Sequence, residues 1–526
     1  MAGKAILTRR SFVVGSGAAA ASFSLGELMF PGSSHAAAKP KKGGKVVYAV
    51  VGHNTRHKSI KTARHPYDGI EIRTKNVFNT LTWVDEELGV QPEVATKWRA
   101  VEDDQTVWEV DIREGVKFHD GRDLRVEDVV ASYNFHRDPK LGTSFAQKML
   151  AKVEKVGPTR ARFFLQTPNS EFPWWTAEYR QVIMPEAPLD KIGMDGIGSG
   201  PFKFAKIDPR RRVVYEANAK YWGDGPYLDT LEVVVQPNMG PAMNGYRSGQ
   251  FDMILGVDPA LVPQFQALPN TKVSFAKAGS QMMLVLPKHE GSPFKDVRIR
   301  KALSLAIDRQ KIIDIVYGGK LGWMTNDTHM TNFNADFLPR KVNRDVAAAK
   351  KLLAEAGFPN GITLPTLYFT TYYPEISRVF QVLAESVKEA GITLPIEVRQ
   401  ESGYRKWRVE DKEKTRKHRF AMAPVGSRNP AANMFRMARP EYNESGYWHP
   451  SKKGDEYIAL YKKAMRTGDA VKRRAIYHEM QRILQDEVPA LFLIGRREID
   501  VVRANVHGWS THSQTWSARF NPVWKA

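Results

Sequence analysis

The stretch FHDGRDLRVEDVVASYNF at residues 118–135 combines a tight turn with the start of an amphipathic helix. The Asp-Gly pair at 120–121 favours a turn at the end of a strand. The acidic pair at 127–128 suits the first turn of a helix, where the helix dipole favours negative charge. The apolar side chains that follow predict the buried face of this helix: Val129, Val130 and Tyr133. A strand, a turn and a helix in this order indicate α/β construction.

The rest of the chain continues the same mixture of strands and helices. Residue patterns bounded by Asp, Gly or Pro predict strands at 45–51, 106–113, 161–166, 212–216 and 230–236. Helical periodicity predicts helices at 125–135, 297–317, 344–356, 374–390, 455–465 and 471–485. Gly357 and Gly391 stand at the ends of two of these helices, where glycine is a common C-cap.

The first 38 residues have the order of an export signal. They comprise a basic start, a weakly apolar stretch at 12–30 and the alanines at 36–38. Glu27 and many small residues interrupt the apolar stretch, so a permanent membrane span is not expected. Residues 8–12, TRRSF, resemble the twin-arginine signal of bacteria, and an ordinary signal with two chance arginines is the alternative. Either signal predicts a soluble protein of the periplasm.

Composition narrows the partners of the mature chain. There is no cysteine, so a disulfide framework and a lipid-attached N-terminal cysteine are both excluded. The formal charge is +21, and removing the signal, with its three basic residues and one acid, leaves +19. A positive field attracts anionic ligands or anionic lipid. Because the basic residues are dispersed and no nucleic-acid-binding motif is present, we expect no nucleic acid partner.

Enzyme signatures fail in their sequence context. The glycines at 196, 198 and 200 are followed by Pro201, where a phosphate-binding helix should begin. The pair His478-Glu479 lacks a second histidine, and no Gly-x-Ser-x-Gly elbow occurs. We therefore expect a binding protein with no cofactor, not an enzyme. The histidines at 53, 57 and 65 keep a metal or metal-chelate ligand open as an alternative.

Several further motifs occur in a fixed order around residues 118–133. They are QPEVATKW at 91–98, GSGPF at 198–202, PFKDVRIRKAL at 293–303, AIDR at 306–309, AKKLLAEAG at 349–357 and DEVP at 486–489. In this order the chain resembles the extracellular solute-binding protein family 5, which includes periplasmic dipeptide-, oligopeptide- and nickel-binding proteins. The motifs themselves are scaffold: we expect Arg298, Arg300 and Asp308 to form an ion-pair set around one shared helix.

The resemblance implies a two-lobed periplasmic-binding-protein fold, class II and cluster C type, with an extra inserted domain and a hinge between the lobes. Lobe one would combine a discontinuous domain I at 39–75, 200–275 and 500–526 with an inserted domain II at 76–199. Lobe two, domain III, would span 276–499. Closure of the lobes around a ligand is the mechanism that this architecture implies.

One segment departs from the pattern of the peptide-binding relatives. Residues 422–430, MAPVGSRNP, look like the segment that pairs with a peptide and supplies an aspartate to its ammonium group. The aspartate position is Gly426 here, and Pro424 removes a backbone donor. Arg428 instead offers a planar fork for a carboxylate or phosphate, with a surface turn as the alternative role. An anionic or polar solute is therefore the hypothesis: an opine-like conjugate, a modified peptide or a sugar derivative.

The resemblance also implies other contacts, each with core or surface packing as its alternative. The candidate binding residues are Val425, Gly426, Ser427, Arg428, Asn429, Tyr404, Trp407, His53, Asn54, Phe145 and Lys148. Trp174 and Trp175 could stack on a sugar ring or pack inside domain II.

The expected function is the periplasmic component of an ABC importer: a monomer that captures a small molecule and delivers it to a membrane permease and ATPase. The alternatives are an ordinary dipeptide- or oligopeptide-binding protein, a nickel-type chelate-binding protein, or a binding module that signals without a permease.

Overall fold

The computed structural model describes most of the chain after the predicted signal. The described residues are 39–51, 75–142, 144–193, 195–208, 211–371, 373–399, 404, 419–439, 448, 450–514 and 517–526. The predicted export segment lies outside them. Within these ranges no helix has both the length and the apolar character needed to cross a membrane.

A single mixed sheet connects most of the strands. Their order across the sheet is β17 (Ile396–Arg399), β15 (Leu367–Thr370), β18 (Ala421–Val425), β12 (Thr271–Val285), β19 (Ala490–Arg503), β11 (Met253–Leu255), β1 (Lys45–Val51), β10 (Thr230–Gln236), β9 (Arg212–Ala217) and β8 (Phe202–Asp208), with β13 (Gly322–Met324) paired to β19. We keep the predicted boundaries as names: lobe two is 276–499, and lobe one is the rest of the described chain.

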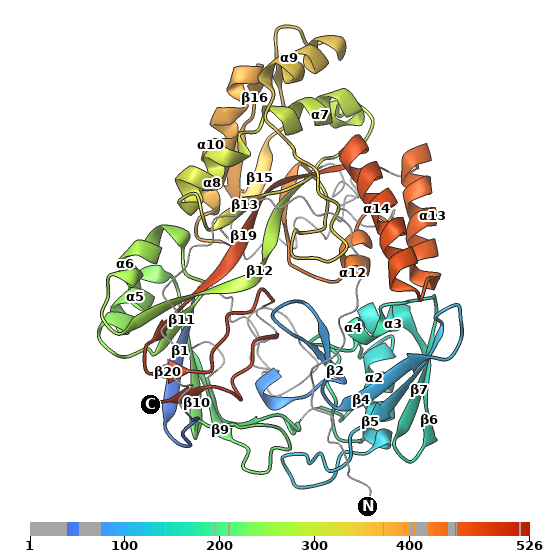
Figure 1. Cartoon of the computed structure of the whole chain (residues 1–526), viewed down its shortest axis with the longest axis vertical. Coiled ribbons are helices and arrows are strands. Elements are labelled where there is room, and N and C mark those ends of the chain that lie inside the picture. The colour runs from blue at the N-terminus through green and yellow to red at the C-terminus, as the bar shows by residue number, and fades with distance from the viewer. Residues whose placement is uncertain are drawn as a thin grey trace, which may run out of the picture. The chain divides into compact units, whose positions relative to one another are not determined.

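Two long strands, β12 and β19, run side by side through the middle of this sheet (Figure 1). Residues 271–275 of β12 pair with 499–503 of β19, and there β19 also pairs with β11 of lobe one. Residues 279–285 pair with 490–497, and there β12 also pairs with β18 of lobe two. The register shifts between Phe275 and Gly279 and again between Gln281 and Met283. The two lobes are therefore joined by a continuous ladder with a local irregularity, which is where a bend costs least.

Helices cover both faces of the lobe-two strands. Because successive side chains of a strand point to opposite faces, Met282 and Leu284 of β12 enter one core and Met283 and Val285 enter another. The first core is covered by α7 (Val297–Ala306), α8 (Arg309–Tyr317), α9 (Val346–Glu355) and α10 (Ile376–Ser386). The second is covered by α12 (Pro430–Met434), α13 (Lys452–Arg466) and α14 (Ala470–Glu487).

Lobe one repeats this layering. Ala49 of β1 packs on one face with α5 (Met239–Arg247) and α6 (Val262–Gln266). Tyr48 packs on the other face, where its ring stacks on Phe520 with the centroids 4.8 Å apart. The remaining short strands form three pairs: β2 (Thr82–Val84) with β3 (Val90–Pro92), β14 (Ile362–Thr363) with β16 (Ile392–Thr393), and β20 (Val506–His507) with β21 (Trp524–Lys525).

The region predicted as domain II contains its own antiparallel sheet. Its order is β4 (Ala95–Ala100), β5 (Val107–Ile112), β7 (Arg160–Leu165) and β6 (Leu150–Gly157). The helices packed with it are α2 (Val126–Arg137), α3 (Ser144–Met149) and α4 (Phe172–Trp175). Within the described ranges, no strand of this sheet pairs with a strand of the large sheet. The domain boundaries given above stay predictions.

The structure confirms several local predictions and corrects two. The strands at 45–51 and 230–236 have the predicted bounds, and Gly357 and Gly391 adopt positive φ at helix ends. The single helix predicted at 297–317 is wrong: Ile307 is extended, and the side chain of Asp308 accepts the Lys311 N–H (2.8 Å) to start α8. A capping side chain offers an alternative to helix continuation that periodicity does not reveal.

The predicted ion-pair set of Arg298, Arg300 and Asp308 is also wrong. Arg298 pairs with Asp296 (2.6 Å). Arg300 is buried and donates mainly to backbone carbonyls, including that of Glu487 (2.7 Å). Because Asp308 caps a different helix, the three side chains have separate roles.

Asp500 is a buried carboxyl on β19, beside the register shift. Burial raises its pKa to about 7, and hydrogen bonds from Gly256 N and Trp509 Nε1 oppose that shift. The folded state therefore holds the Asp500 proton more tightly than the unfolded state, for which 3.8 is the ordinary pKa.

We predict that the free energy of unfolding falls as pH rises from about 4 to about 7, by about 1.4 kcal/mol per unit of pKa shift. Asp500→Asn should remove this part of the pH dependence, and Asp190→Asn at an exposed position should not. Urea unfolding at several pH values measures it. Parallel pH profiles for the parent and Asp500→Asn would contradict the prediction.

Candidate functional site

The predicted binding segment begins where β18 leaves the large sheet. Val425 pairs with Gln281 of β12, and Pro424 lies opposite Met282. Gly426 is half-buried, and a Cβ placed on it would meet no atom within 4 Å. The segment therefore leaves the sheet at a point where there is open space above the backbone.

Ser427 is held from two sides. Its hydroxyl donates to the carbonyl of Gly279 at the register shift of β12, and its own carbonyl accepts a hydrogen bond from Gln514 Nε2 of lobe one. Ser427 and Gln514 are both buried. Ser427 thus fixes the segment after β18 both to lobe one and to β12. We call β12 the hinge strand because it runs through both lobes.

Asn429, on the other side of Arg428, is also hydrogen-bonded to both lobes. Its Oδ1 accepts the Ala432 N–H (3.1 Å) and caps α12, and its Nδ2 donates to Glu171 Oε2 of the inserted domain. The same carboxylate oxygen accepts the Ala431 N–H (3.2 Å). Glu171 therefore joins the inserted domain to the start of α12.

Arg428 lies between these two anchors and is half-buried. Its carbonyl accepts from Asn433 Nδ2 (3.2 Å) and Asn334 Nδ2 (3.4 Å). Burial lowers the pKa of Arg428, the positive charges of Arg436 and Arg180 lower it further, and Glu178 opposes the shift. A guanidinium whose strongest charged neighbours are cations is well placed to bind an added anion.

Two residues bonded to this segment, Gln281 and Asn433, have buried side-chain atoms without a hydrogen-bond partner among the described residues. Gln281 donates to the Met330 carbonyl (2.9 Å), but its Oε1 has no partner, and neither does Asn433 Oδ1. Both ring nitrogens of the fully buried His329 also lack one. Burial lowers the pKa of His329 well below its usual range, and Arg436 adds to this, so the ring is neutral. Buried groups of this kind need a partner such as a ligand or water.

Of the other predicted contacts, the structure describes Tyr404, Lys148 and the backbone of Phe145. Tyr404 is buried, and its hydroxyl donates to the carbonyls of Met422 (2.7 Å) and Tyr368 (3.0 Å), which is packing behind β18. Lys148 is exposed on α3, and the backbone of Phe145 belongs to the same helix. Trp407, His53 and Asn54 lie outside the described residues, as do the histidines at 57 and 65. Among the described residues no cluster of His, Asp or Glu could hold a metal.

The tryptophan pair packs inside the inserted domain. Trp174 and Trp175 are buried in the core of that sheet and meet edge to face, with ring centroids 5.6 Å apart.

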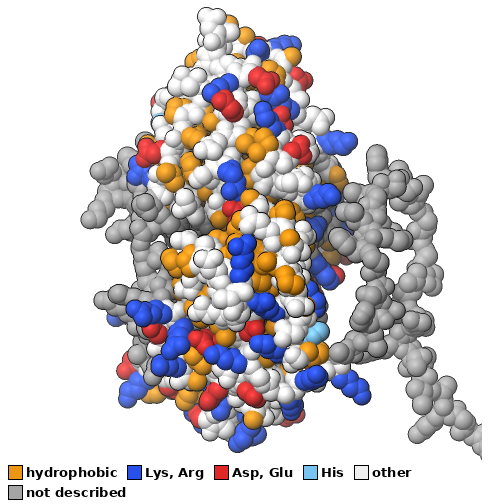
Figure 2. All heavy atoms as spheres, turned by 90° about the vertical axis from the view of Figure 1, so that its left-hand side faces the viewer, with side chains coloured by type: hydrophobic (Ala, Val, Ile, Leu, Met, Phe, Trp, Pro, Cys, Tyr) orange, Lys and Arg blue, Asp and Glu red, His pale blue; other side chains and the backbone are white. Residues whose placement is uncertain are grey.

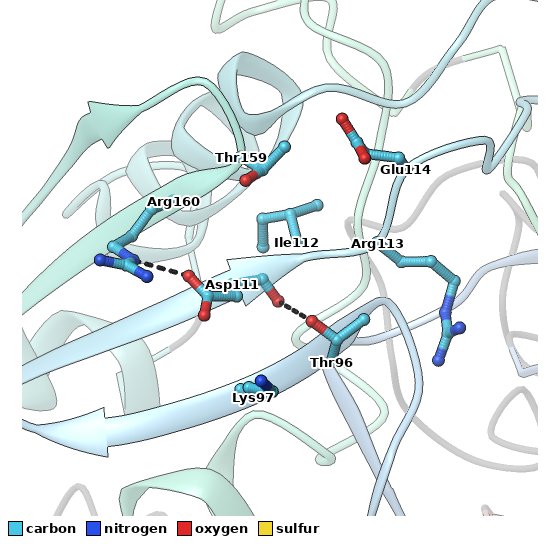
Figure 3. Close-up of a pocket in the computed structure, with 8 residues that line it drawn as sticks. All are labelled: Thr96, Lys97, Asp111, Ile112, Arg113, Glu114, Thr159 and Arg160. Atoms are coloured by element: carbon cyan, nitrogen blue, oxygen red, sulfur yellow. Dashed lines mark hydrogen bonds and ion pairs between the residues drawn. The ribbon is translucent and has the colours of Figure 1, made fainter. Parts of the chain in front are cut away.

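Two pockets in the described structure lie away from Arg428. One, of about 330 Å³, lies at the edge of the inserted sheet (Figure 3). Its charged groups are partly matched internally, since Arg160 Nε donates to Asp111 Oδ1 (2.6 Å). The other, of about 660 Å³, lies in lobe two between Arg309 and Arg344. Neither contains a residue of the predicted site.

Sequence reasoning missed Glu171 and Gln514. A helix start at Asn429-Pro430 could have been read from the sequence, because Asn is a good N-cap and Pro is common at the next position. Nothing local marks the partner of Asn429, which is 258 residues away.

A large sheet with helices on both faces, crossed by two shared strands and joined to an inserted sheet, defines a two-lobed α/β binding protein. Residues 89–438 match the model of the bacterial extracellular solute-binding proteins, family 5. The chain belongs to this family, and the predicted fold class is confirmed.

Known relatives agree on the fold. The oligopeptide-binding protein AppA of Bacillus subtilis is 29% identical over 339 residues, which is 61% of this chain and 61% of AppA. The structure of NikA from Brucella suis with Fe(III)-EDTA has a TM-score of 0.79 at 20% identity and covers 92% of this chain and 100% of that one. The structure of AgaA from A. tumefaciens R10 with agropinic acid has a TM-score of 0.73 at 21% identity. The match covers 92% of this chain and 99% of AgaA.

The space above Gly426 and the crowding at Gly279 make a matched pair of tests. A Cβ at Gly279 would lie 2.1 Å from the Arg496 carbonyl oxygen and 2.4 Å from the Trp323 ring. We predict that Gly279→Ala lowers the free energy of unfolding by about 1–3 kcal/mol through overpacking, and that Gly426→Ala changes it by less than about 0.5 kcal/mol. Guanidinium unfolding measures both. Equal effects would show that the segment is not packed as described.

Proposed function

We propose that the protein is the periplasmic solute-binding component of an ABC importer, and that its cargo is a small polar solute with an acid group held by Arg428. The observation that carries the proposal is the position of Arg428: it is half-buried between anchors to both lobes, with cationic Arg436 and Arg180 as its main charged neighbours. Family membership supports the class of function.

Gly426 stands where the peptide-binding relatives have an aspartate, which favours an acidic solute over an ordinary peptide as the ligand. No carboxylate stands at the position that the resemblance assigns to the ammonium partner. Glu178, whose negative charge opposes the lowering of the Arg428 pKa, is itself paired with Arg180 (2.6 Å). AppA is an oligopeptide-binding protein, whereas AgaA was solved with agropinic acid. A carboxylate-bearing chelate, such as the one solved with NikA, would suit the same arginine.

The unpartnered buried groups favour a solute that is also rich in hydrogen-bonding groups. Gln281 Oε1 and Asn433 Oδ1 are acceptors, and neutral His329 has one donor and one acceptor nitrogen. Hydroxyl and amide groups of an opine-like conjugate, a modified peptide or a sugar derivative would satisfy them. The proposed ligand class is therefore a solute with an acid group that binds Arg428 and neutral polar groups that bind the buried side chains beside it.

Capture would proceed by lobe closure. Diffusion is helped by the positive charge of the chain, although on the face shown in Figure 2 the basic side chains are interspersed with acidic ones. A solute bound to Arg428 in lobe two would be enclosed when the inserted domain and Gln514 meet that segment. The closed monomer would then dock on an inner-membrane permease and ATPase. These steps, and the export that places the chain in the periplasm, belong to the proposal.

Replacing Arg428 tests the proposed cargo. Native mass spectrometry of gently purified protein identifies the retained solute, and calorimetric titration gives its affinity. We predict that Arg428→Gln weakens binding of that solute roughly 10- to 100-fold, the usual effect of losing a hydrogen bond to a charged group. Arg122→Gln, at an exposed position of the inserted domain, removes the same charge and should leave affinity unchanged. Equal affinities of the parent and Arg428→Gln would refute the role of Arg428.

Introducing a carboxylate at residue 426 tests whether its absence there disfavours ordinary peptides. The open space there accepts a side chain, so Gly426→Asp should fold normally. We predict that the new carboxylate pairs with Arg428, weakens binding of the acidic solute at least about tenfold and allows neutral dipeptides to bind. Gly426→Asn is the uncharged control. Thermal-shift assays with a dipeptide panel give the readout, and tight binding of neutral dipeptides by the parent protein would overturn the proposed cargo.

A further inference from the structure

Glu171 is an almost buried carboxylate of the inserted domain whose partners are nearly all in lobe two. Its side chain is 9% exposed. Oε2 accepts from Asn429 Nδ2 and Ala431 N, and Oε1 accepts from the Tyr477 hydroxyl (2.8 Å), with Arg473 Nε at 3.6 Å. Groups on α12 and α14 thus meet on one side chain that lobe one supplies.

The residues around Glu171 make the same connection. The Ser170 N–H donates to the Met465 carbonyl (2.9 Å), and the Ser170 hydroxyl donates to the Ala464 carbonyl (3.1 Å) at the end of α13. Ala432 of α12 packs in the core of the inserted sheet together with Phe172. The segment 170–172 is therefore the point where the inserted domain docks on lobe two.

The donors to the Glu171 carboxylate come from α12 and α14 of lobe two, so a separation of the lobes would remove them together. Burial raises the pKa of Glu171, and its hydrogen bonds with Tyr477 and Ala431 and the charge of Arg473 oppose that shift. A desolvated carboxylate is stable only with its donors in place, and removing them leaves a buried charge that is costly. When the lobes separate, water replaces all the donors together. The contact is therefore either complete or absent.

We propose that Glu171 is a positioning residue: in the closed state it holds Asn429 and the start of α12 so that Arg428 faces the bound solute, and it determines how long the lobes stay closed. Arg428 is adjacent to Asn429, so an arginine that belongs to lobe two is set in place by a side chain of the inserted domain. The role of Arg428 rests on the proposed function, whereas the contact between the lobes is tested without any solute.

The cysteine-free chain allows closure to be measured by crosslinking. A Cβ at Gly468 of lobe two lies 2.9 Å from Gln105 Nε2 of the inserted domain. In a chain carrying Gln105→Cys and Gly468→Cys, the two sulfur atoms can come within bonding distance only when the lobes are together, because a disulfide requires Cβ atoms about 3.5–4.5 Å apart. Its rate of formation under fixed oxidant, in solute-free protein, reports the population of the closed state even when that population is small.

Glu171→Ala in this background should slow disulfide formation about tenfold, and Glu171→Gln, which keeps an acceptor but loses the charge, should slow it less. Glu154, an acid of the inserted domain that pairs with Lys152, gives the matched control: Glu154→Ala should have no effect. Melting temperatures of the variants separate a loss of closure from a loss of folding. Adding Asn429→Ala should make the Glu171 effect smaller, because the two side chains are directly bonded.

Disulfide formation at the parental rate in both Glu171 variants would overturn the proposal. Slowing by Asn429→Ala that simply adds to that of Glu171→Ala would also overturn it, because residues 171 and 429 would then act independently. Retention of the solute is measured separately, on the chain without cysteines. Failure of the proposed solute binding can therefore be distinguished from loss of the Glu171 contact between the lobes.

Discussion

Pairing between β12 and β19 is the constraint on which the rest of the structure depends. One end of this ladder is held by β11 and the lobe-one sheet, and the other by β18 and β13. Neither lobe can move without bending these two strands, and the register shifts between Phe275 and Gly279 and between Gln281 and Met283 are the places where the ladder is already irregular. The carbonyl of Gly279 also accepts the hydroxyl of Ser427. The binding segment is thus tied directly to the point about which the lobes bend.

The arrangement around Arg428 follows from that connection. Ser427 is bound to the hinge strand and to Gln514, and Asn429 is bound to Glu171. The guanidinium between them is placed by residues of the hinge, of lobe one and of the inserted domain, although it belongs to lobe two. A group placed by both lobes has a fixed position only when the lobes are together. Under the proposed function, closure would therefore also shape the binding site.

The sequence predicts the strands and helices of this fold better than the break between two helices or the contacts between distant segments. The strands at 45–51 and 230–236 lie in a sheet covered on both faces, so their apolar residues are sufficient to locate them. The helix predicted at 297–317 fails because Asp308 caps α8 after an extended Ile307, within an uninterrupted apolar period. Arg428 could be selected because its residue type suits an anion. Its anchors could not, because the Glu171 and Gln514 partners lie 258 and 87 residues from the residues they bind.

Charge balance explains why closure should depend on the solute. Bringing the lobes together places two kinds of charge in a poorly hydrated region: the carboxylate of Glu171, and the guanidinium of Arg428 beside Arg436 and Arg180. The chain provides donors for Glu171 from α12 and α14. For Arg428 the main nearby charges are cations, so closing the empty protein leaves part of its desolvation cost uncompensated. In the proposed function, an anion would supply the compensation that the described residues do not, and the closed state would then be favoured by the difference between the solute's affinity for closed and open protein.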